Sequence, residues 1–351
     1  MSNEQTEGLD DLFKRLLPHP APNGEGPAPP GSDDYYFESY DNFGIHQDMI
    51  KDSVRTDAYM KAICGNPQLF KDKVVLDVGC GTGILSLFAA EAGAKKVYSV
   101  DQSRIVEQAK KIVALNGKED VITVIDGKVE DIEIPEGGVD IIISEWMGYF
   151  LLYESMLDSV IAARDKWLNP GGIIFPDRAS LYMCGIEDER QREISIYFWE
   201  DIYGFDMSCI CPLVEAEPMV EIVSHDQIIT DSTRFKTINI ETATVEDLAF
   251  ASEFAIKATQ TNNLSALACW FDVEFTHGEK TVCLPTGPMT QSTHWKQASL
   301  FLPEAILLEE GDVFEGTLVC RPSAANRRGL DIGLEFGVRN GMRQSHSQYR
   351  M

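Results

Sequence analysis

Two glutamates lie nine residues apart in the segment SEWMGYFLLYE, which spans residues 144–154. Glu145 directly follows the apolar run VDIII at 139–143, and Glu154 stands among aromatic residues. A carboxylate in apolar surroundings is costly unless a cation pairs with it. The pattern therefore predicts that both glutamates face a cation, which can belong either to the protein or to a substrate.

A glycine-rich stretch, VLDVGCGTG at 75–83, places Gly79, Gly81 and Gly83 between a predicted strand and a predicted helix. Such a turn lets a ligand approach the backbone at a helix N-terminus. The dinucleotide fingerprint requires a small residue at the next position, where this chain has Ile84. NAD and FAD are therefore disfavoured as cofactors.

Three acidic residues follow three predicted strands: Asp101, Glu130 and Glu145. Ligands of parallel sheets bind at the carboxyl ends of the strands, so we expect the three acids to belong to one site. Asp101 is placed to accept hydrogen bonds from ribose hydroxyls, and Glu130 from an adenine amino group.

The elements that must position these residues alternate between strand and helix from residue 35 to about residue 176. Predicted strands lie at 73–78, 96–101, 121–127 and 139–145, and predicted helices at 83–93, 104–117 and 156–168. This alternation predicts an α/β fold with a parallel, doubly wound sheet.

After Pro176 the pattern changes to β-rich runs at 266–275, 312–320 and 330–336. The last run alternates apolar and polar residues, which is typical of an antiparallel sandwich or barrel. Between the two regions, residues 194–210 carry a dense group of aromatic side chains that neither core requires.

Residues 1–34 are rich in proline and glycine and are predicted to form a disordered tail. Leu9, Leu12, Phe13, Leu16 and Leu17 fall at helical spacing within it. A short docking helix is the alternative, but so brief a helix is marginal by itself and disorder is favoured.

The formal net charge of −26 disfavours direct nucleic-acid binding and would attract a basic substrate. No apolar run has the length of a membrane span, and no signal-like N-terminus is seen. The eight cysteines form no C-x-x-C pair and are expected to be reduced, in the nucleus and cytoplasm. Cys269, His277 and Cys283 lack a fourth partner, so no metal site is predicted.

These motifs together resemble a known family. VLDVGCGTG resembles the S-adenosylmethionine loop of class I (Rossmann-like) methyltransferases, and SEWMGYFLLYE resembles the double-glutamate loop of protein arginine N-methyltransferases. YYFESY (35–40), HQDMIKDSVRT (46–56) and THWKQ (293–297) are further matches, most similar to the predominant type I enzyme. The resemblance extends over nearly the whole chain outside the tail.

The resemblance implies an S-adenosylmethionine-binding domain at 35–176 and a β-barrel substrate-binding domain at 177–351. It also implies a helical arm at about 187–217 that forms a head-to-tail homodimer able to assemble further, and a cis peptide bond before Pro176.

The resemblance also assigns roles to individual residues. Glu145 and Glu154 clamp a substrate guanidinium, while His294 pairs with Asp52. Arg55 is the counter-ion of the cofactor's carboxylate. The cofactor-binding set is His46, Arg55, Asp77, Gly79, Gly81, Asp101 and Glu130. Tyr36 and Tyr40 close over both ligands, and Met49 and Met156 line the volume beside the attacking nitrogen.

Two carboxylates suit this chemistry because both reactants, a guanidinium and a sulfonium, are cations. Unit charges about 4 Å apart repel by roughly 4 kcal/mol at an effective dielectric near 20. A pair of carboxylates offsets this repulsion and orients one nitrogen toward the methyl group.

The family's close members usually carry glutamate in place of Asp101 and serine in place of Cys80. Aspartate occurs there in other class I methyltransferases, so ribose binding is expected to persist.

The predicted function is methylation of arginines in Arg-Gly-rich segments and histone tails, giving monomethyl- and asymmetric dimethylarginine. Three alternatives remain open at this point. A methyltransferase of DNA or small amines is disfavoured because no N/D-P-P-Y/W motif is present. The intact Glu145, Glu154 and Arg55 argue against an inactive scaffold, and Ile84 argues against a nucleotide oxidoreductase.

Overall fold

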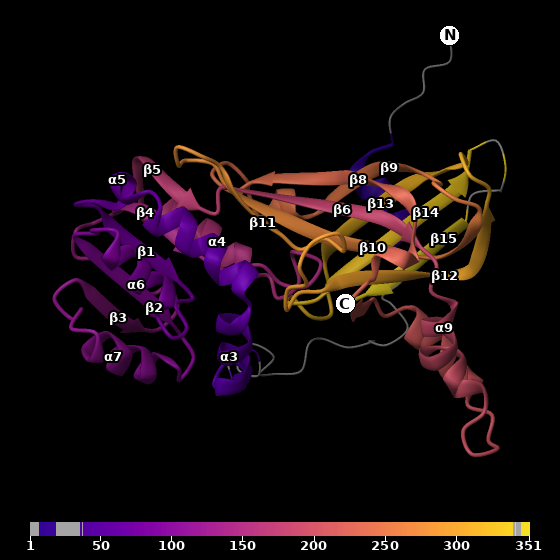
Figure 1. Ribbon diagram of the computed structural model, residues 1–351, viewed down its shortest axis with the longest axis horizontal. Coiled ribbons are helices and arrows are strands. Elements are labelled where there is room, and N and C mark those ends of the chain that lie inside the picture. The colour runs from indigo at the N-terminus through magenta and orange to yellow at the C-terminus, as the bar shows by residue number, and fades with distance from the viewer. Residues whose placement is uncertain (1–6, 19–35, 37, 340, 342–344) are drawn as a thin grey trace, which may run out of the picture.

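The computed structural model describes residues 7–18, 36, 38–339, 341 and 345–351, arranged as two domains and a projecting arm (Figure 1). The parts of the predicted tail at 1–6 and 19–34 lie outside the described residues.

The first domain is built on a five-stranded parallel sheet of order β3-β2-β1-β4-β5. Its strands are β1 (Val74–Val78), β2 (Lys96–Asp101), β3 (Ile122–Asp126), β4 (Val139–Ser144) and β5 (Leu168–Phe175). All neighbouring strands pair in parallel, so their carboxyl ends meet at one edge. The predicted parallel sheet is confirmed, and the sequence missed only β5.

Helices cover this sheet: α4 (Ser53–Cys64), α5 (Pro67–Phe70), α6 (Ile84–Glu91), α7 (Val106–Leu115) and α8 (Met156–Trp167), with α3 (Phe43–Lys51) preceding them. The three helices predicted from the sequence correspond to α6, α7 and α8. Asp52 ends α3 and begins α4, and its side-chain Oδ1 accepts a hydrogen bond from the Arg55 amide. This cap fixes the angle between α3 and α4.

The second domain is an antiparallel β-barrel made of two sheets. One sheet has the order β7-β12-β10-β6-β8 with β11 paired to β10, and the other has the order β15-β14-β13-β9. The strands are β6 (Arg178–Ile186), β7 (Met219–Glu221), β8 (Ile228–Asn239), β9 (Phe250–Lys257), β10 (Asn262–Phe275), β11 (Val282–Pro285), β12 (Gln297–Leu308), β13 (Val313–Pro322), β14 (Leu330–Val338) and β15 (Ser345–Arg350). Short 3-10 turns, η3 (His225–Gln227) and η4 (Glu246–Leu248), connect them.

The two domains join at Phe175, whose ring stacks on Phe70 of the α/β domain and on Phe275 of the barrel. The Phe175–Pro176 peptide is cis, as the resemblance implies.

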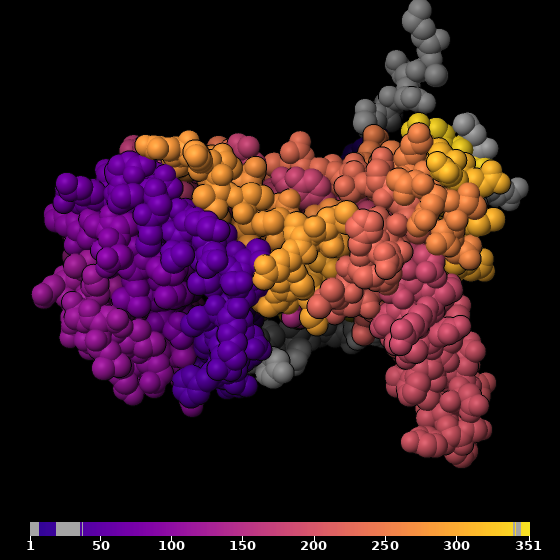
Figure 2. Space-filling view, in the orientation of Figure 1, coloured from indigo at the N-terminus to yellow at the C-terminus, as the bar shows by residue number. Residues whose placement is uncertain are grey.

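The arm consists of α9 (Glu189–Ser195), η1 (Tyr197–Glu200), η2 (Ser208–Ile210) and α10 (Cys211–Glu215). It projects from the barrel, and its tip stands clear of both domains (Figure 2). At its base, Arg192 is almost fully buried and donates to the carbonyl oxygens of Leu302 (2.6 Å) and Ser265 (3.1 Å).

The prediction that residues 1–34 are disordered is wrong for residues 9–17. Helix α1 (Leu9–Leu16) packs on the outer face of the sheet that contains β13 and β14, burying Phe13, Leu16 and Leu17. This face presents small residues, since a Cβ on Gly333 would lie 3.0 Å from Leu16 Cβ. The barrel thus supplies the packing that so short a helix cannot supply for itself.

None of the helices in the described part of the chain combines the length and the apolar run that a membrane crossing needs.

Candidate active site

The two glutamates are held by a folded loop that begins where β4 ends at Ser144. Phe150, Leu151, Glu154 and Ser155 all have positive φ, a conformation that costs energy for residues other than glycine. Gly148 makes the loop possible, because a Cβ there would lie 1.9 Å from the Tyr153 carbonyl oxygen. So costly a backbone persists only where its surroundings fix it.

Glu145 is paired with a cation that belongs to the protein. Arg55 Nε, from α4, lies 2.9 Å from Glu145 Oε2, and the two side chains are only 7% and 8% exposed. Arg55 Nη1 also donates to the Met49 carbonyl oxygen at 3.2 Å. The resemblance predicts that Arg55 faces the cofactor's carboxylate, and the structure shows its Nε paired with Glu145.

Glu154 is held differently, by hydroxyl groups. Tyr40 Oη donates to Glu154 Oε2 at 2.8 Å, and the Tyr36 hydroxyl also bonds to this carboxylate. Burial raises the pKa of Glu154, hydrogen bonds from Tyr40 and Tyr36 oppose the rise, and the Glu145 charge adds to it. Glu154 is therefore a stronger base than an ordinary glutamate.

The N-terminal aromatic residues connect the glutamate loop to the glycine loop. The rings of Tyr36 and Tyr40 are 5.2 Å apart in an edge-to-face arrangement. His46 is buried, and its Nε2 lies 2.7 Å from the Tyr40 carbonyl oxygen. A Cβ on Gly81 would lie 3.4 Å from His46 Nδ1. The structure thus brings Tyr36, Tyr40 and His46 to the predicted site.

The glycine loop between β1 and α6 has the form that a backbone-bound ligand requires. Gly79, Gly81 and Gly83 have φ of +71°, +54° and +87°. A Cβ on Gly79 would lie 2.3 Å from Met156 Cε, so Met156 stands directly over the loop. A side chain at position 79 would be strained by the positive φ and would displace the Met156 methyl group, so glycine suits this position.

Asp101 ends β2 beside this loop, and its Oδ2 accepts from the Gly81 amide at 2.8 Å while Oδ1 accepts from the Ser103 amide at 2.8 Å. Asp77 lies fully buried in β1, where its Oδ2 accepts from Ser86 Oγ at 2.6 Å. Burial raises the pKa of Asp77 to about 7. Asp101 is thus at the ligand edge, whereas Asp77 supports the loop from beneath.

Glu130 is exposed in the segment that follows β3, and its Oε1 accepts from Ser159 Oγ at 2.6 Å. Met49 lies half-buried on α3. These residues, with the loops after β1, β2 and β4, share the predicted edge of the sheet.

The predicted pair of Asp52 and His294 is present and joins the domains. His294 Nδ1 lies 2.8 Å from Asp52 Oδ2, and its amide donates to the same oxygen at 2.8 Å. Burial would raise the pKa of Asp52, but the hydrogen bonds from His294 and the Arg55 amide outweigh it and lower that pKa. Trp295 Nε1 donates to the Met147 carbonyl oxygen at 2.8 Å.

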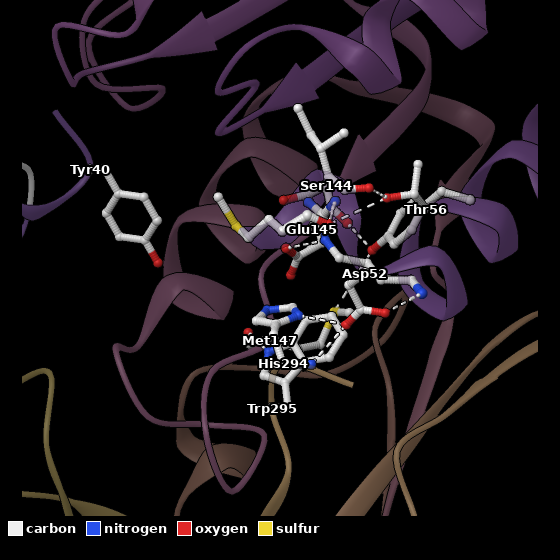
Figure 3. A network of polar contacts seen from close by, with 12 residues as sticks. Tyr40, Asp52, Thr56, Ser144, Glu145, Met147, His294 and Trp295 are labelled. Atoms are coloured by element: carbon white, nitrogen blue, oxygen red, sulfur yellow. Dashed lines mark hydrogen bonds and ion pairs between the residues drawn. The ribbon is translucent and has the colours of Figure 1, made fainter. Parts of the chain in front are cut away.

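These contacts are gathered around Glu145, and Tyr40 stands apart from them (Figure 3). The barrel loop that carries His294 therefore contacts both α4 and the double-glutamate loop, and it fixes one against the other.

Sequence reasoning missed one residue of the site, Arg328, in the loop between β13 and β14. Arg328 Nη1 donates to the Glu154 carbonyl oxygen at 2.7 Å, and its guanidinium carbon lies 3.7 Å from the centre of the Tyr36 ring. No local spacing links residues so far apart, and the signal available was only a basic pair in a barrel loop.

No group of three His, Cys, Asp or Glu side chains within the described ranges is arranged to hold a metal ion.

Two family descriptions match the chain, in agreement with its two domains. "Methyltransferase domain" matches residues 75–172, and "Arginine methyltransferase oligomerization subdomain" matches residues 177–341.

Curated relatives match along most of the chain. Protein arginine N-methyltransferase 1 of Chlamydomonas reinhardtii is 50% identical over 93% of this chain and 96% of its own. Its namesake from Saccharomyces cerevisiae is 48% identical over 87% of this chain and 88% of its own.

Solved structures are similar as well. The PRMT1 enzyme-prozyme heterotetrameric complex with AdoHcy from Trypanosoma brucei has a TM-score of 0.87 at 45% identity, covering 89% of this chain and 99% of that one. Protein arginine methyltransferase 10 of Arabidopsis thaliana has a TM-score of 0.81 at 34% identity, covering 90% of this chain and 99% of its own.

Proposed function

The chain belongs to the protein arginine N-methyltransferase family, and from this premise we propose that Glu145 and Glu154 hold the guanidinium of a protein arginine during methyl transfer. The activity is that of a type I enzyme, which uses S-adenosylmethionine and forms asymmetric dimethylarginine.

One observation carries the assignment of the two glutamates. Both project from a single loop whose conformation is fixed by the barrel and by the N-terminal aromatics, and both carboxylates are largely buried. A planar guanidinium matches such a pair because it can donate two parallel hydrogen bonds. A solvated surface pair would need none of these supports.

The residues around the glycine loop fit a nucleoside cofactor with a positive sulfur. Gly79 and Gly81 would let the cofactor approach the backbone, and Asp101, whose Oδ2 accepts from the Gly81 amide, would bind the ribose. His46 lies beside Gly81. When bound, S-adenosylmethionine supplies the methyl group as an electrophile. Arg55, between α3 and Glu145, would hold the cofactor's carboxylate.

Glu154 would accept the proton that leaves the attacking nitrogen. Burial raises the pKa of this carboxyl, so it binds a proton more readily than an exposed glutamate does. Glu145, tied to Arg55, would retain its negative charge and orient the guanidinium.

We propose that the substrates are basic Arg-Gly-rich protein segments and histone tails, in the nucleus and cytoplasm. The formal net charge of −26 favours basic partners by long-range attraction. Methylation by the endogenous enzyme in separated nuclear and cytoplasmic fractions would test the location.

The chain carries an oligomerization subdomain, and we propose that it forms a homodimer through the arm. Tyr203 is 99% exposed, Phe205 68% and Phe198 53%, so the arm displays apolar side chains that need a partner surface. We propose assembly beyond the dimer from the heterotetrameric state named for the similar Trypanosoma brucei complex.

The test of the function is incubation of the purified chain with labelled S-adenosylmethionine and an Arg-Gly-Gly peptide, followed by mass spectrometry of the arginine. Label on the guanidino nitrogens is expected. Absence of label, with the cofactor shown by calorimetry to bind, would refute catalysis by this chain alone and leave the scaffold alternative.

A further inference from the structure

Arg328 occupies a rigid position in the loop that joins β13 to β14. The loop is closed by hydrogen bonds from the Gly329 amide to the Asn326 carbonyl oxygen (2.8 Å) and from the Ser323 amide to the Gly329 carbonyl oxygen (2.9 Å). The Asn326 side chain accepts from the Arg328 amide at 3.1 Å. Arg328 itself is only 9% exposed. The barrel therefore presents this side chain in one orientation.

The loop contacts the double-glutamate loop through the backbone in both directions. The Glu154 amide donates to the Arg328 carbonyl oxygen at 2.7 Å, and Arg328 Nη1 donates to the Glu154 carbonyl oxygen at 2.7 Å. Ser155 Oγ donates to the Arg327 carbonyl oxygen at 2.6 Å. These three bonds surround the residue whose carboxylate binds the substrate.

Glu154 needs such support because its φ is +79° and that of Ser155 is +55°. Each positive φ at a residue with a side chain costs about 1–3 kcal/mol and persists only when neighbouring structure enforces it. The Arg328 guanidinium makes one of the bonds that hold this conformation. Its central carbon also lies 3.7 Å from the centre of the Tyr36 ring, so it stacks over that ring. Arg328 thus contacts both Glu154 and Tyr36, whose hydroxyl bonds to the Glu154 carboxylate.

We propose that Arg328 is a positioning residue for arginine methylation, which holds Glu154 and Tyr36 in the geometry that the substrate guanidinium requires. This inference rests on the proposed function of Glu154. Arg328 acts through its neighbours, and the barrel domain thereby contributes to the chemistry at the edge of the other domain.

Charge gives the proposal a second readout. The titratable and charged groups that face Glu154 are Tyr36 and Tyr40 from the N-terminal segment, Tyr149 and Glu145 from its own loop, and Arg328 from the barrel. Among them, the Arg328 charge lowers the pKa of Glu154, while burial and Glu145 raise it. Loss of the cation would raise this pKa further, so a larger fraction of Glu154 would be protonated at a given pH.

The experiment compares Arg328→Gln, Arg328→Lys and the control Arg327→Gln in the full-length chain. Arg327 is adjacent and exposed, so its variant loses the same charge from the same loop. The measurements are kcat and KM for an Arg-Gly-Gly peptide across pH, S-adenosylhomocysteine affinity by calorimetry, and the thermal unfolding temperature.

Arg328→Gln is expected to lower kcat by about 10²-fold, as expected for a displacement near 1 Å of a catalytic group. Its S-adenosylhomocysteine affinity should stay within about twofold of the wild-type value, because a substitution outside the cofactor site should not change cofactor binding by more than this. The acid limb of its pH profile should move to higher pH. Arg328→Lys keeps the charge but not the planar stacking, so its acid limb should return toward wild type while kcat stays low.

The proposal would be overturned if Arg328→Gln kept the wild-type kcat and the wild-type acid limb of the pH profile. It would also be overturned if Arg327→Gln lost as much kcat as Arg328→Gln. A parallel loss of S-adenosylhomocysteine affinity, which indicates general damage, would overturn it too. If Arg328→Gln does not fold, Arg328→Lys decides, because wild-type kcat there would leave no role for the stacked guanidinium. A wild-type enzyme that methylates no arginine would instead refute the proposed function itself.

Discussion

Arg55 Nε lies 2.9 Å from Glu145 Oε2, and both side chains are more than nine-tenths buried. Glu154, nine residues on, is bound by the Tyr40 hydroxyl instead. The two carboxylates of one clamp therefore stabilise the protein differently: Glu145 neutralises a buried cation, whereas Glu154 accepts from neutral groups.

Glutamine substitutions should separate these roles. Glu145→Gln leaves Arg55 buried without its carboxylate, which costs about 3–5 kcal/mol of unfolding free energy. In Glu154→Gln the amide oxygen can still accept from Tyr40, so the fold and the cofactor site should be retained. Both variants should lose about 10²–10³-fold in methyl transfer.

Denaturant unfolding and peptide methylation would measure the two effects, with the exposed Glu119→Gln as control. Equal stability of the two clamp variants would contradict the distinction between them. Wild-type turnover by Glu154→Gln would remove Glu154 from the mechanism.

The buried Asp77 should make the stability of the folded protein depend on pH. Burial raises the pKa of Asp77 in the folded protein from its ordinary value of 3.8 to about 7. A carboxyl with a raised folded pKa contributes stability that is fully present below the unfolded pKa, declines as pH rises above that value, and is lost once pH exceeds about 7. Asp77→Asn is uncharged at every pH and can still accept from Ser86.

We therefore expect Asp77→Asn to unfold at a higher temperature than wild type, by a larger margin at pH 8 than at pH 5. Each kcal/mol corresponds to about 2–4 °C for a domain of this size. Calorimetric scans of the protein without cofactor at both pH values test this. A wild type whose stability does not fall between them would show that Asp77 ionises normally.

If the arm forms the dimer, activity should depend on dimerisation. Changing both Trp199 and Tyr203 to alanine removes large apolar area from its tip and should give monomers with little activity. The control is Leu115→Ala on α7, a residue that is 86% exposed but lies outside the arm. Sedimentation at micromolar concentration measures the outcome, and a fully active monomeric wild type would refute the dimer.

The type of methylated product depends on the space beside the attacking nitrogen. Met49 and Met156 have unbranched side chains that leave room for a methylated nitrogen to turn back for a second transfer. Met156 stands over the cofactor loop at Gly79, as expected for a residue beside the transferred methyl. Fragmentation mass spectrometry should show monomethylarginine first and then neutral loss of dimethylamine, the mark of the asymmetric product. Predominant loss of monomethylamine would contradict it.

The docking of helix α1 on the barrel should depend on the buried Leu16. Leu16 is 2% exposed beneath the helix, and Arg15 Nη1 reaches Glu335 Oε1 at 2.5 Å. Leu16→Ala should release α1 from the barrel at a cost of about 2 kcal/mol or more. Hydrogen exchange of the α1 amides should then accelerate, whereas Leu9→Ala, at a position 41% exposed, should leave it slow. Unchanged exchange in Leu16→Ala would refute the docking.

The sequence determined the elements whose signals are local. Alternating strands and helices, the glycine turn and the acids that follow the strands are read within about ten residues of chain, and the parallel sheet necessarily brings their ends to one edge. The motifs also indicated the family, because each is a contiguous stretch that carries a specific chemistry.

Tertiary structure alone decided the contacts between residues distant in sequence. Helix α1 forms because the barrel offers Gly333 and Val319 as a shallow face, which the tail's own composition does not reveal. Arg55 pairs with Glu145 across 90 residues, and Arg328 reaches Glu154 across 174. No periodicity records such pairings, because they depend on how distant elements pack, within one domain for Arg55 and between the two domains for Arg328.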